Sequence, residues 1–269
     1  MARIAPDRRA IQEDCRSEPG EHWHRHFTGP ATLERTSATW RLVVTNASAK
    51  RYTDAQIDDY HGKPRHAFTW RPPLQLTVRA RFSHQERQLK GTAGFGFWND
   101  PFLMTGWRWP ALPRAVWFFF ASSPSDMMLD LEAPGNGWKA MSLDALCRPF
   151  IALCPALPLI IPWMNIRPLR RRLWPVVQHA MRARETLLDV DMTAWHLYQI
   201  TWTEEKVAFV LDGEVILDGV PAPRGPLGFV LWMDNQFAVA TPWGRLGHGL
   251  LDIPDCQWLE IDSLSIESD

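Results

Sequence analysis

Short alternating segments separated by glycine and proline turns set the strongest limit on how this chain can fold. Leu74–Phe82 alternates apolar and polar residues, and Thr39–Thr45 has the same strand-like character. Ala115–Ala121 is continuously apolar, as in a strand that is buried on both faces. Further short segments follow, from Trp195–Trp202 to Trp258–Glu267. Many short strands joined by turns are typical of a β-sandwich, so we expect an all-β fold.

Length and charge narrow the class of protein. A chain of 269 residues fits one large sandwich or two small domains, and no flexible linker interrupts its central part. We therefore expect an N-terminal arm or edge strand over residues 1–36 and one domain over 37–269. The net charge of -1, with no long run of Arg or Lys, gives no case for a nucleic-acid partner.

The N-terminus and the cysteines favour a reducing compartment. Met1–Arg9 is charged and has no apolar stretch behind it, so it does not resemble a secretory signal. The four cysteines lack metal-ligand spacing: Cys15, Cys147, Cys154 and Cys256. We expect reduced thiols, a cytoplasmic location and no cofactor.

An acidic segment is the clearest candidate for chemistry. Pro124–Glu132, which ends at the turn Ala133–Gly137, is predicted as a strand with Met128, Asp130 and Glu132 on one face. Two carboxylates two positions apart repel each other, which raises the pKa of at least one and suits it to act as a general acid. An edge strand with a solvated acidic face is the alternative.

Sequence on both sides of this segment is similar to a known family. Gly94–Trp98 precedes it, and Trp195–Trp202 and Val207–Leu217 follow it. This order resembles the concanavalin A-like jelly roll of glycoside hydrolase family 16, in which a Glu-x-Asp-x-Glu strand carries the nucleophile, an assisting Asp and the acid/base Glu. The resemblance implies that Asp130 and Glu132 match the last two positions, with Met128 in place of the nucleophile. A thioether cannot form a glycosyl ester, so retaining glycosidase chemistry is not expected.

The resemblance also implies where a ligand lies. In the family, aromatic and amide side chains on a concave sheet hold the substrate. The matching candidates, each of them either a wall residue or a core residue, are Trp98, Asn99, Met128, Trp232, Asp234, Asn235 and Gln236. His196 is expected to pack within the sheet as a hydrogen-bonded core histidine, with a catalytic role as the alternative.

Two further polar rows have both a functional and a structural interpretation. One carries imidazoles at alternating positions, His22, His24 and His26, and could bind a transition metal. A solvated terminal strand is favoured there, so no metal site is predicted. The other carries Asp54, Gln56 and Asp58, which could line a concave polar site or bind calcium. A polar loop is slightly favoured for this row.

Residues 143–190 interrupt the strand pattern. Phe150–Met164 is the most apolar stretch, but its prolines argue against a membrane-spanning helix because each removes a backbone hydrogen bond. A helix is predicted over Leu169–Leu188, kinked at Pro175. We expect a hydrophobic, partly helical insertion in the jelly roll. It could be a packing subdomain, a lid over the cleft or a patch that contacts membrane lipid.

Two classes of function remain open. The first is an intracellular enzyme that uses Glu132 as acid/base, tuned by Asp130, to cyclise, isomerise or hydrate a bulky apolar terpenoid- or polyketide-like small molecule. The second is a glycan-binding module or a hydrolase of the family 16 type. Neither the substrate nor the oligomeric state follows from the sequence.

Overall fold

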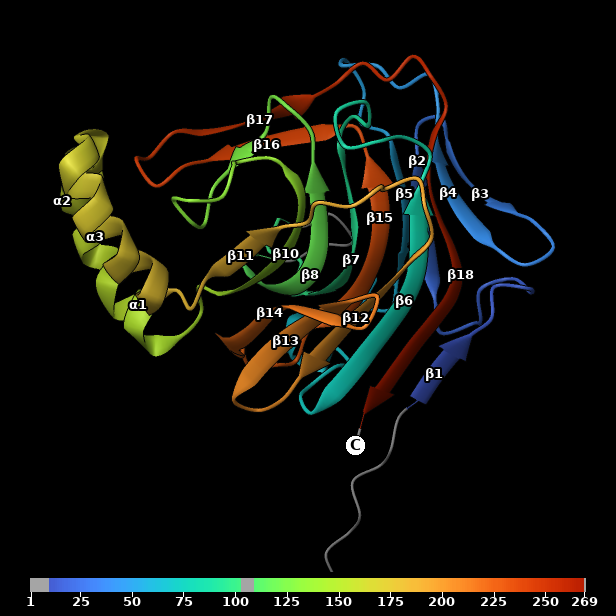
Figure 1. Ribbon diagram of the computed structural model, residues 1–269, viewed down its shortest axis with the longest axis horizontal. Coiled ribbons are helices and arrows are strands. Elements are labelled where there is room, and N and C mark those ends of the chain that lie inside the picture. Colours follow the sequence, from blue (N-terminus) through green and yellow to red (C-terminus); the bar gives the residue numbers. More distant parts are fainter. Residues whose placement is uncertain (1–9, 103–108, 269) are drawn as a thin grey trace, which may run out of the picture.

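Two antiparallel sheets packed face to face form the body of the molecule (Figure 1). This computed structural model describes residues 10–102 and 109–268. The predicted all-β jelly-roll sandwich is confirmed, with β6 and β8 at the positions expected from the sequence.

The first sheet runs in the order β14-β13-β12-β6-β18-β4-β3, and β1 also pairs with β18. Its long β6 alternates buried and exposed residues, as its sequence predicts. The strands are β1 (Ala10–Glu13), β3 (Ala31–Arg35), β4 (Trp40–Val44), β6 (Leu74–Phe82), β12 (His196–Trp202), β13 (Lys206–Leu211), β14 (Glu214–Pro221) and β18 (Gln257–Ser268).

The second sheet runs in the order β11-β10-β8-β7-β15-β5-β2. Its strands are β2 (His24–Thr28), β5 (Asp54–Asp58), β7 (Thr92–Trp98), β8 (Arg114–Ala121), β10 (Gly137–Asp144), β11 (Arg184–Leu187) and β15 (Gly228–Asp234). A small third sheet joins β9 (Asp126–Met127), β16 (Gln236–Ala240) and β17 (Leu246–Leu250), and a short 3-10 turn, η1, covers Arg65–Ala67. The described residues of the predicted N-terminal arm, 10–36, supply the edge strands β1, β2 and β3; residues 1–9 lie outside the described part.

Interlocking aromatic rings fill the space between the two sheets. Phe95, Phe118, Trp138 and Tyr198 are fully buried, and their ring centroids lie 5.0–6.0 Å apart. Burial of one such ring contributes about 2 kcal/mol. A shift of one residue in any of these strands would turn its rings out of the core, so the core fixes which side chains point away from it.

The insertion consists of short helical pieces at one side of the sandwich, beside β11 and the β16–β17 hairpin (Figure 1). They are α1 (Arg148–Leu153), η2 (Cys154–Ala156), α2 (Leu157–Ile160), η3 (Ile161–Asn165) and α3 (Arg167–Ala180). Each piece has a proline in its first two positions, where no backbone N–H is needed. The predicted helix over 169–188 instead ends at Ala180, because Arg184–Leu187 pairs with β10. Among the described residues, no helix is long and apolar enough to cross a membrane.

The predicted strand over 124–132 is wrong. Only Asp126–Met127 forms a strand, and the chain turns where the Ala133 N–H donates to the Asp130 carbonyl. Side-chain carboxylates accept the hydrogen bonds that a neighbouring strand would otherwise take. Asp130 Oδ1 accepts from the Glu132 N–H, and Glu185 Oε1 accepts from the N–H groups of Leu129 and Asp130.

Candidate functional site

The second sheet has one face that points away from the first sheet, which we call the distal face. Charged, polar and aromatic side chains lie on it. Alternate residues of each strand, such as Ala55, Ile57 and Phe95, enter the core between the sheets. Their neighbours therefore lie on the distal face. It carries Asp54, Gln56 and Asp58 of β5, Trp98 of β7, Trp117 and Phe119 of β8, Lys139 of β10, and Trp232 and Asp234 of β15.

Four aromatic side chains form a continuous cluster at the centre of this face: Trp98, Trp117, Phe119 and Trp232. The ring centroids of successive neighbours lie 5.2–5.9 Å apart. Glycines on β7 make room for the rings, because a Cβ on Gly96 would lie 2.6 Å from the Cβ of Trp117. A Cβ on Gly94 would lie 3.0 Å from the Trp232 ring. Trp98 and Trp232, two predicted wall residues, thus belong to one apolar surface.

The indole N–H groups of this cluster are anchored at its ends. Trp98 Nε1 donates to the Tyr60 hydroxyl at 2.6 Å, and Trp232 Nε1 donates to Thr92 Oγ1 at 3.0 Å. With the N–H groups satisfied, the ring faces are left as the apolar part of the site.

The helical insertion packs onto the same apolar cluster. Phe150, Met164 and Trp174 of the insertion are buried together with the aromatic residues of the distal face. Trp174 Nε1 also donates to the Leu129 carbonyl at 2.9 Å, which ties α3 to the turn after β9. The four rings of the cluster are consequently only 6–8% exposed. The inner side of the insertion therefore packs against the distal face in one buried cluster, as the packing-subdomain interpretation expects. The lid and the lipid-contacting patch stay predictions.

Two buried aspartates lie beside Trp232. Asp54 and Asp234 are directly opposite each other on β5 and β15, and each is less than 5% exposed. Burial, and then the charge of Asp234, raise the pKa of Asp54 well above its ordinary value; a hydrogen bond from Tyr52 offsets part of this. Burial raises the pKa of Asp234 to about 6. One Asp54 oxygen, Oδ1, has no hydrogen-bond partner among the described residues.

The predicted catalytic pair does not lie on this face. Asp130 is in the turn after β9, where its Oδ2 accepts a hydrogen bond from Gln178 of α3 at 3.0 Å. Glu132 is exposed at the end of that turn, and Met128 is half-buried just before it. The neighbouring Leu129 and Leu131 pack against the tryptophan cluster, whereas the recorded partners of the Asp130 side chain are Gln178 and the Glu132 N–H. Their catalytic roles stay a prediction.

The remaining predicted wall residues mostly hold loops. The Asn99 amide accepts from the Arg114 N–H and donates to the Leu112 carbonyl, closing the loop between β7 and β8. Asn235 Oδ1 accepts from the Thr53 N–H, and its Nδ2 donates to the carbonyls of Ser48, Arg51 and Leu251. Gln236 starts β16 and is half-buried.

His196 lies on the first sheet, away from the distal face. Its ring is hydrogen-bonded to Asp212 Oδ2 at 2.6 Å and to the Asp191 carbonyl at 3.0 Å. The ring is hydrogen-bonded as expected, but His196 is half-buried at the start of β12 and is not a core residue.

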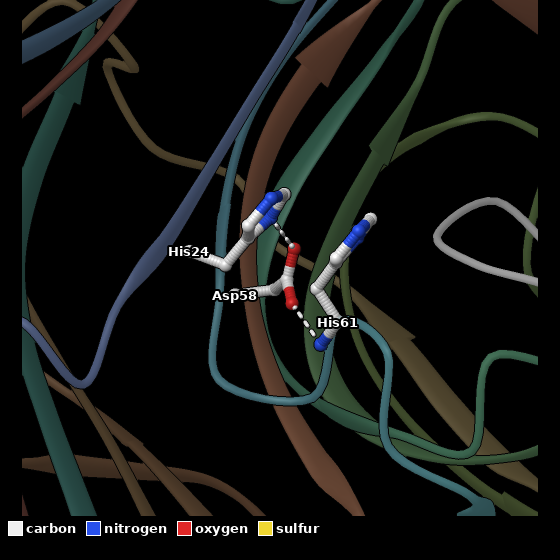
Figure 2. A group of neighbouring side chains, drawn as sticks. All are labelled: His24, Asp58 and His61. Atoms are coloured by element: carbon white, nitrogen blue, oxygen red, sulfur yellow. Dashed lines mark hydrogen bonds and ion pairs between the residues drawn. The ribbon is translucent and has the colours of Figure 1, made fainter.

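A group of histidines surrounds the other end of β5. His24 Nδ1 lies 3.4 Å from Asp58 Oδ2, and the His24 and His61 rings are stacked with centroids 3.7 Å apart (Figure 2). His26 follows on the same face of β2, and burial, with the neighbouring His24 and His61, lowers its pKa. His22 lies before β2 and contacts Glu13 instead. The predicted row of three imidazoles is thus broken, and His61 takes the third place.

An ion pair of Lys139 and Glu185 closes the opposite end of the distal face. Lys139 Nζ lies 3.0 Å from Glu185 Oε2, and both side chains are at least 98% buried. Burial raises the pKa of Glu185, although Lys139 offsets part of that effect. Lys139 also donates to the Met127 carbonyl, so the pair fixes the turn that carries Asp130. The Lys139–Glu185 pair therefore has a structural role.

Comparison with known proteins agrees on the fold. No known family model matches the chain, and no curated protein matches it in sequence. Among solved structures, a GlcNAcα1-4Gal-releasing endo-β-galactosidase from Clostridium perfringens matches with a TM-score of 0.56 at 12% identity, over 98% of this chain and 62% of that one. This chain thus spans less than two thirds of that enzyme. A laminarinase from Flavobacterium sp. UMI-01 matches with a TM-score of 0.52 at 12% identity, over 95% of this chain and 98% of that one.

A carbohydrate recognition domain, that of Emp47p, matches with a TM-score of 0.50 at 10% identity, over 96% of this chain and 94% of that one. Sugar-cleaving enzymes and a recognition domain therefore share this architecture. The chain has the concanavalin A-like jelly roll seen in glycoside hydrolase family 16, as the sequence resemblance implies. At these identities the likeness establishes the scaffold, not the reaction.

Proposed function

We propose that this protein is an enzyme that binds a bulky apolar small molecule on the distal face, beneath the helical insertion, and acts on it by acid/base chemistry. The observation that carries the proposal is the aromatic cluster of Trp98, Trp117, Phe119 and Trp232, which shares one apolar surface with the insertion. Aromatic faces bind apolar ligands and stabilise positive charge as it develops on them.

The side chains of β8, the strand beside the central strand β7, argue against glycosidase chemistry. β8 presents Ala115, Trp117, Phe119 and Ala121 on the distal face, none of which can be a nucleophile or an acid.

The buried aspartates supply an acid for the proposed chemistry. Burial and the charge of Asp234 raise the pKa of Asp54 well above its ordinary value, which favours its protonated, acidic form. Asp54 lies opposite Asp234, and Thr92 connects Asp234 to Trp232. The Thr92 hydroxyl donates to Asp234 Oδ1 and accepts a hydrogen bond from Trp232 Nε1. Protonation of an alkene is a step that cyclisation, isomerisation and hydration share. The sequence assigns this acid to Glu132, which is exposed.

Deuterium incorporation tests the acid directly. The protein is incubated in D₂O with isoprenoid alcohols such as farnesol and geranylgeraniol, and carbon-bound deuterium is measured by mass spectrometry. Asp54→Asn should lower the rate by roughly two to four orders of magnitude, the usual contribution of a positioned acid. Glu132→Gln is the matched control and should leave the rate unchanged. Loss in Glu132→Gln with full activity in Asp54→Asn would return the acid role to Glu132.

Binding separates the apolar-ligand proposal from a glycan-binding module. Trp117→Leu should weaken binding of geranylgeraniol, and Trp195→Leu should not, because Trp195 lies against Arg79 and Arg81 of the first sheet. Binding of laminarin oligosaccharides with no binding of the isoprenoids would instead support the recognition module that the Emp47p likeness raises.

The outer side of the insertion carries arginines and exposed apolar residues, which suggest a membrane as the source of such a ligand. Residues 145–184 contain seven arginines and no acidic residue, so this segment is strongly basic. The rest of the chain holds the other 22 of the 29 basic residues and all 30 acidic residues. Leu159, Trp163 and Val176 are 58–74% exposed on these helices. Exposed apolar side chains beside arginines are typical of a helix that lies in the headgroup region of an anionic bilayer. We therefore place this surface on an anionic membrane; a cytoplasmic location remains a prediction.

Co-sedimentation with vesicles tests the membrane contact. The protein should bind phosphatidylserine-containing vesicles and not pure phosphatidylcholine. Arg171→Gln with Arg172→Gln should weaken binding by about 2 kcal/mol, or roughly 30-fold, at about 1 kcal/mol per arginine. Trp163→Asp should abolish it. Val215→Asp, at an equally exposed valine of β14, is the control. Equal binding to both kinds of vesicle, or equal loss in Val215→Asp, would contradict the contact.

A further inference from the structure

We propose that His24, Asp58 and His61 form a binding site for a divalent transition metal ion such as Zn²⁺. The site lies where β2 meets β5, at the edge of the distal face (Figure 2). Each residue offers one ligand atom, and the three atoms all lie within 4.8 Å of one another. The proposal does not depend on the function proposed above.

The distances are near those of a coordinated ion. Zn²⁺ holds nitrogen and oxygen ligands at about 2.0–2.2 Å, so two ligands of a tetrahedral ion lie about 3.4 Å apart. His24 Nδ1 and Asp58 Oδ2 already have this separation of 3.4 Å. His61 supplies the third ligand atom from the exposed turn after β5, within 4.8 Å of the other two.

Asp58 is held in place as a ligand rather than as a surface charge. It is completely buried, and its Oδ1 accepts the backbone N–H groups of Tyr60 and His61 at 3.1 and 2.7 Å. These bonds shape the turn that presents the His61 ring. Gln56 Nε2 donates to the other oxygen, Oδ2, at 2.9 Å. Outer hydrogen bonds of this kind orient a carboxylate that binds a metal.

The donor set selects the class of ion. Two imidazoles and one carboxylate suit Zn²⁺, Co²⁺ and related ions, whereas Ca²⁺ and Mg²⁺ prefer oxygen ligands alone. A third imidazole is near, because the His26 ring centroid lies 6.2 Å from that of His24 and 6.3 Å from that of His61. The site thus differs from an oxygen-only calcium site, which is the interpretation that the Asp54–Asp58 row allows from sequence.

Cobalt spectroscopy and zinc calorimetry test the site on the full-length protein without a histidine tag. One Co²⁺ ion per chain should bind and give the intense visible absorption of a four-coordinate centre, and Zn²⁺ should displace it. His61→Asn should weaken Zn²⁺ binding by at least roughly tenfold. Because His61 is exposed, this change should leave the thermal unfolding of the metal-free protein unaltered.

His66→Asn is the matched control, since His66 is an exposed histidine in η1, five residues further along the chain. It should bind Co²⁺ and Zn²⁺ like the unaltered protein. The proposal is overturned by a Co²⁺ spectrum without the intense visible bands, by His61→Asn that binds Zn²⁺ as tightly as the unaltered protein, or by His66→Asn that weakens binding as much as His61→Asn.

Discussion

Replacing Asp234 by Asn removes one charge from the buried aspartate pair and changes little else. Asp234 Oδ1 accepts all three hydrogen bonds recorded for this side chain, from Thr92 Oγ1, the Thr92 N–H and the Gln236 N–H. The Asn side-chain oxygen can accept the same three bonds. Its NH₂ group replaces Oδ2 beside Asp54, so the substitution isolates the effect of the negative charge.

The effect on the free energy of unfolding follows from the pKa of Asp234, which burial raises from 3.8 to about 6. Below pH 3.8 the group is protonated in both the folded and the unfolded chain, and its charge costs nothing. Between pH 3.8 and 6 the unfolded chain ionises first, so the folded state loses stability as pH rises. The loss reaches about 3 kcal/mol above pH 6, at about 1.4 kcal/mol for each pH unit between the two values.

Urea denaturation of both proteins at a series of pH values measures this loss. The free energy of unfolding of Asp234→Asn, relative to the unaltered protein, should rise by about 3 kcal/mol between about pH 4 and pH 7. Groups that do not interact with Asp234 cancel in the difference. The charge of Asp234 also raises the pKa of Asp54, so that pKa falls in the variant and adds to the rise. A difference that does not change with pH, or that falls as pH rises, would refute the raised pKa and with it the buried acid pair.

Three further substitutions test other parts of the structure by the same urea assay. Lys139→Met leaves Glu185 charged and buried, so it should cost about 3–5 kcal/mol; a loss below about 1 kcal/mol would mean that the pair is solvated. Gly96→Ala should cost about 1–3 kcal/mol, because the new Cβ would lie 2.5 Å from the Val116 carbonyl oxygen and 2.6 Å from Trp117 Cβ; Gly247→Ala, whose Cβ would make only ordinary contact with Val239 at 3.6 Å, should cost much less. Glu132→Gln should change stability by no more than about 0.5 kcal/mol, as expected at an exposed turn; a larger loss would contradict its exposure.

The fold is predictable from the sequence because its signal is repeated in many strands. Leu74–Phe82 alternates cleanly, and β8 is continuously apolar, so each has one consistent position in a sandwich. The insertion was placed by its prolines and apolar residues. Its end was missed because Arg184–Leu187 is short, and only its pairing with β10 makes it a strand.

The site was harder to predict because tertiary contacts decide it. The strand expected over 124–132 is absent because Glu185, distant in sequence, accepts the N–H groups of Leu129 and Asp130. Asp54–Asp58 was taken as a polar loop, although its alternation was visible; it is a strand because β2 and β15 pair with it on either side. Trp98 and Trp232 were found because aromatic residues stand out even without a structure.

Photo-crosslinking tests the central claim most directly. A geranylgeranyl probe that carries a diazirine is irradiated with the full-length protein, and the labelled peptides are identified by mass spectrometry. The account predicts labels on β7, β8 and β15 around Trp98, Trp117 and Trp232, together with α3, and loss of these labels when excess geranylgeraniol competes. Labels confined to the exposed helices or to the first sheet, or labels that excess geranylgeraniol does not reduce, would contradict an apolar ligand site on the distal face.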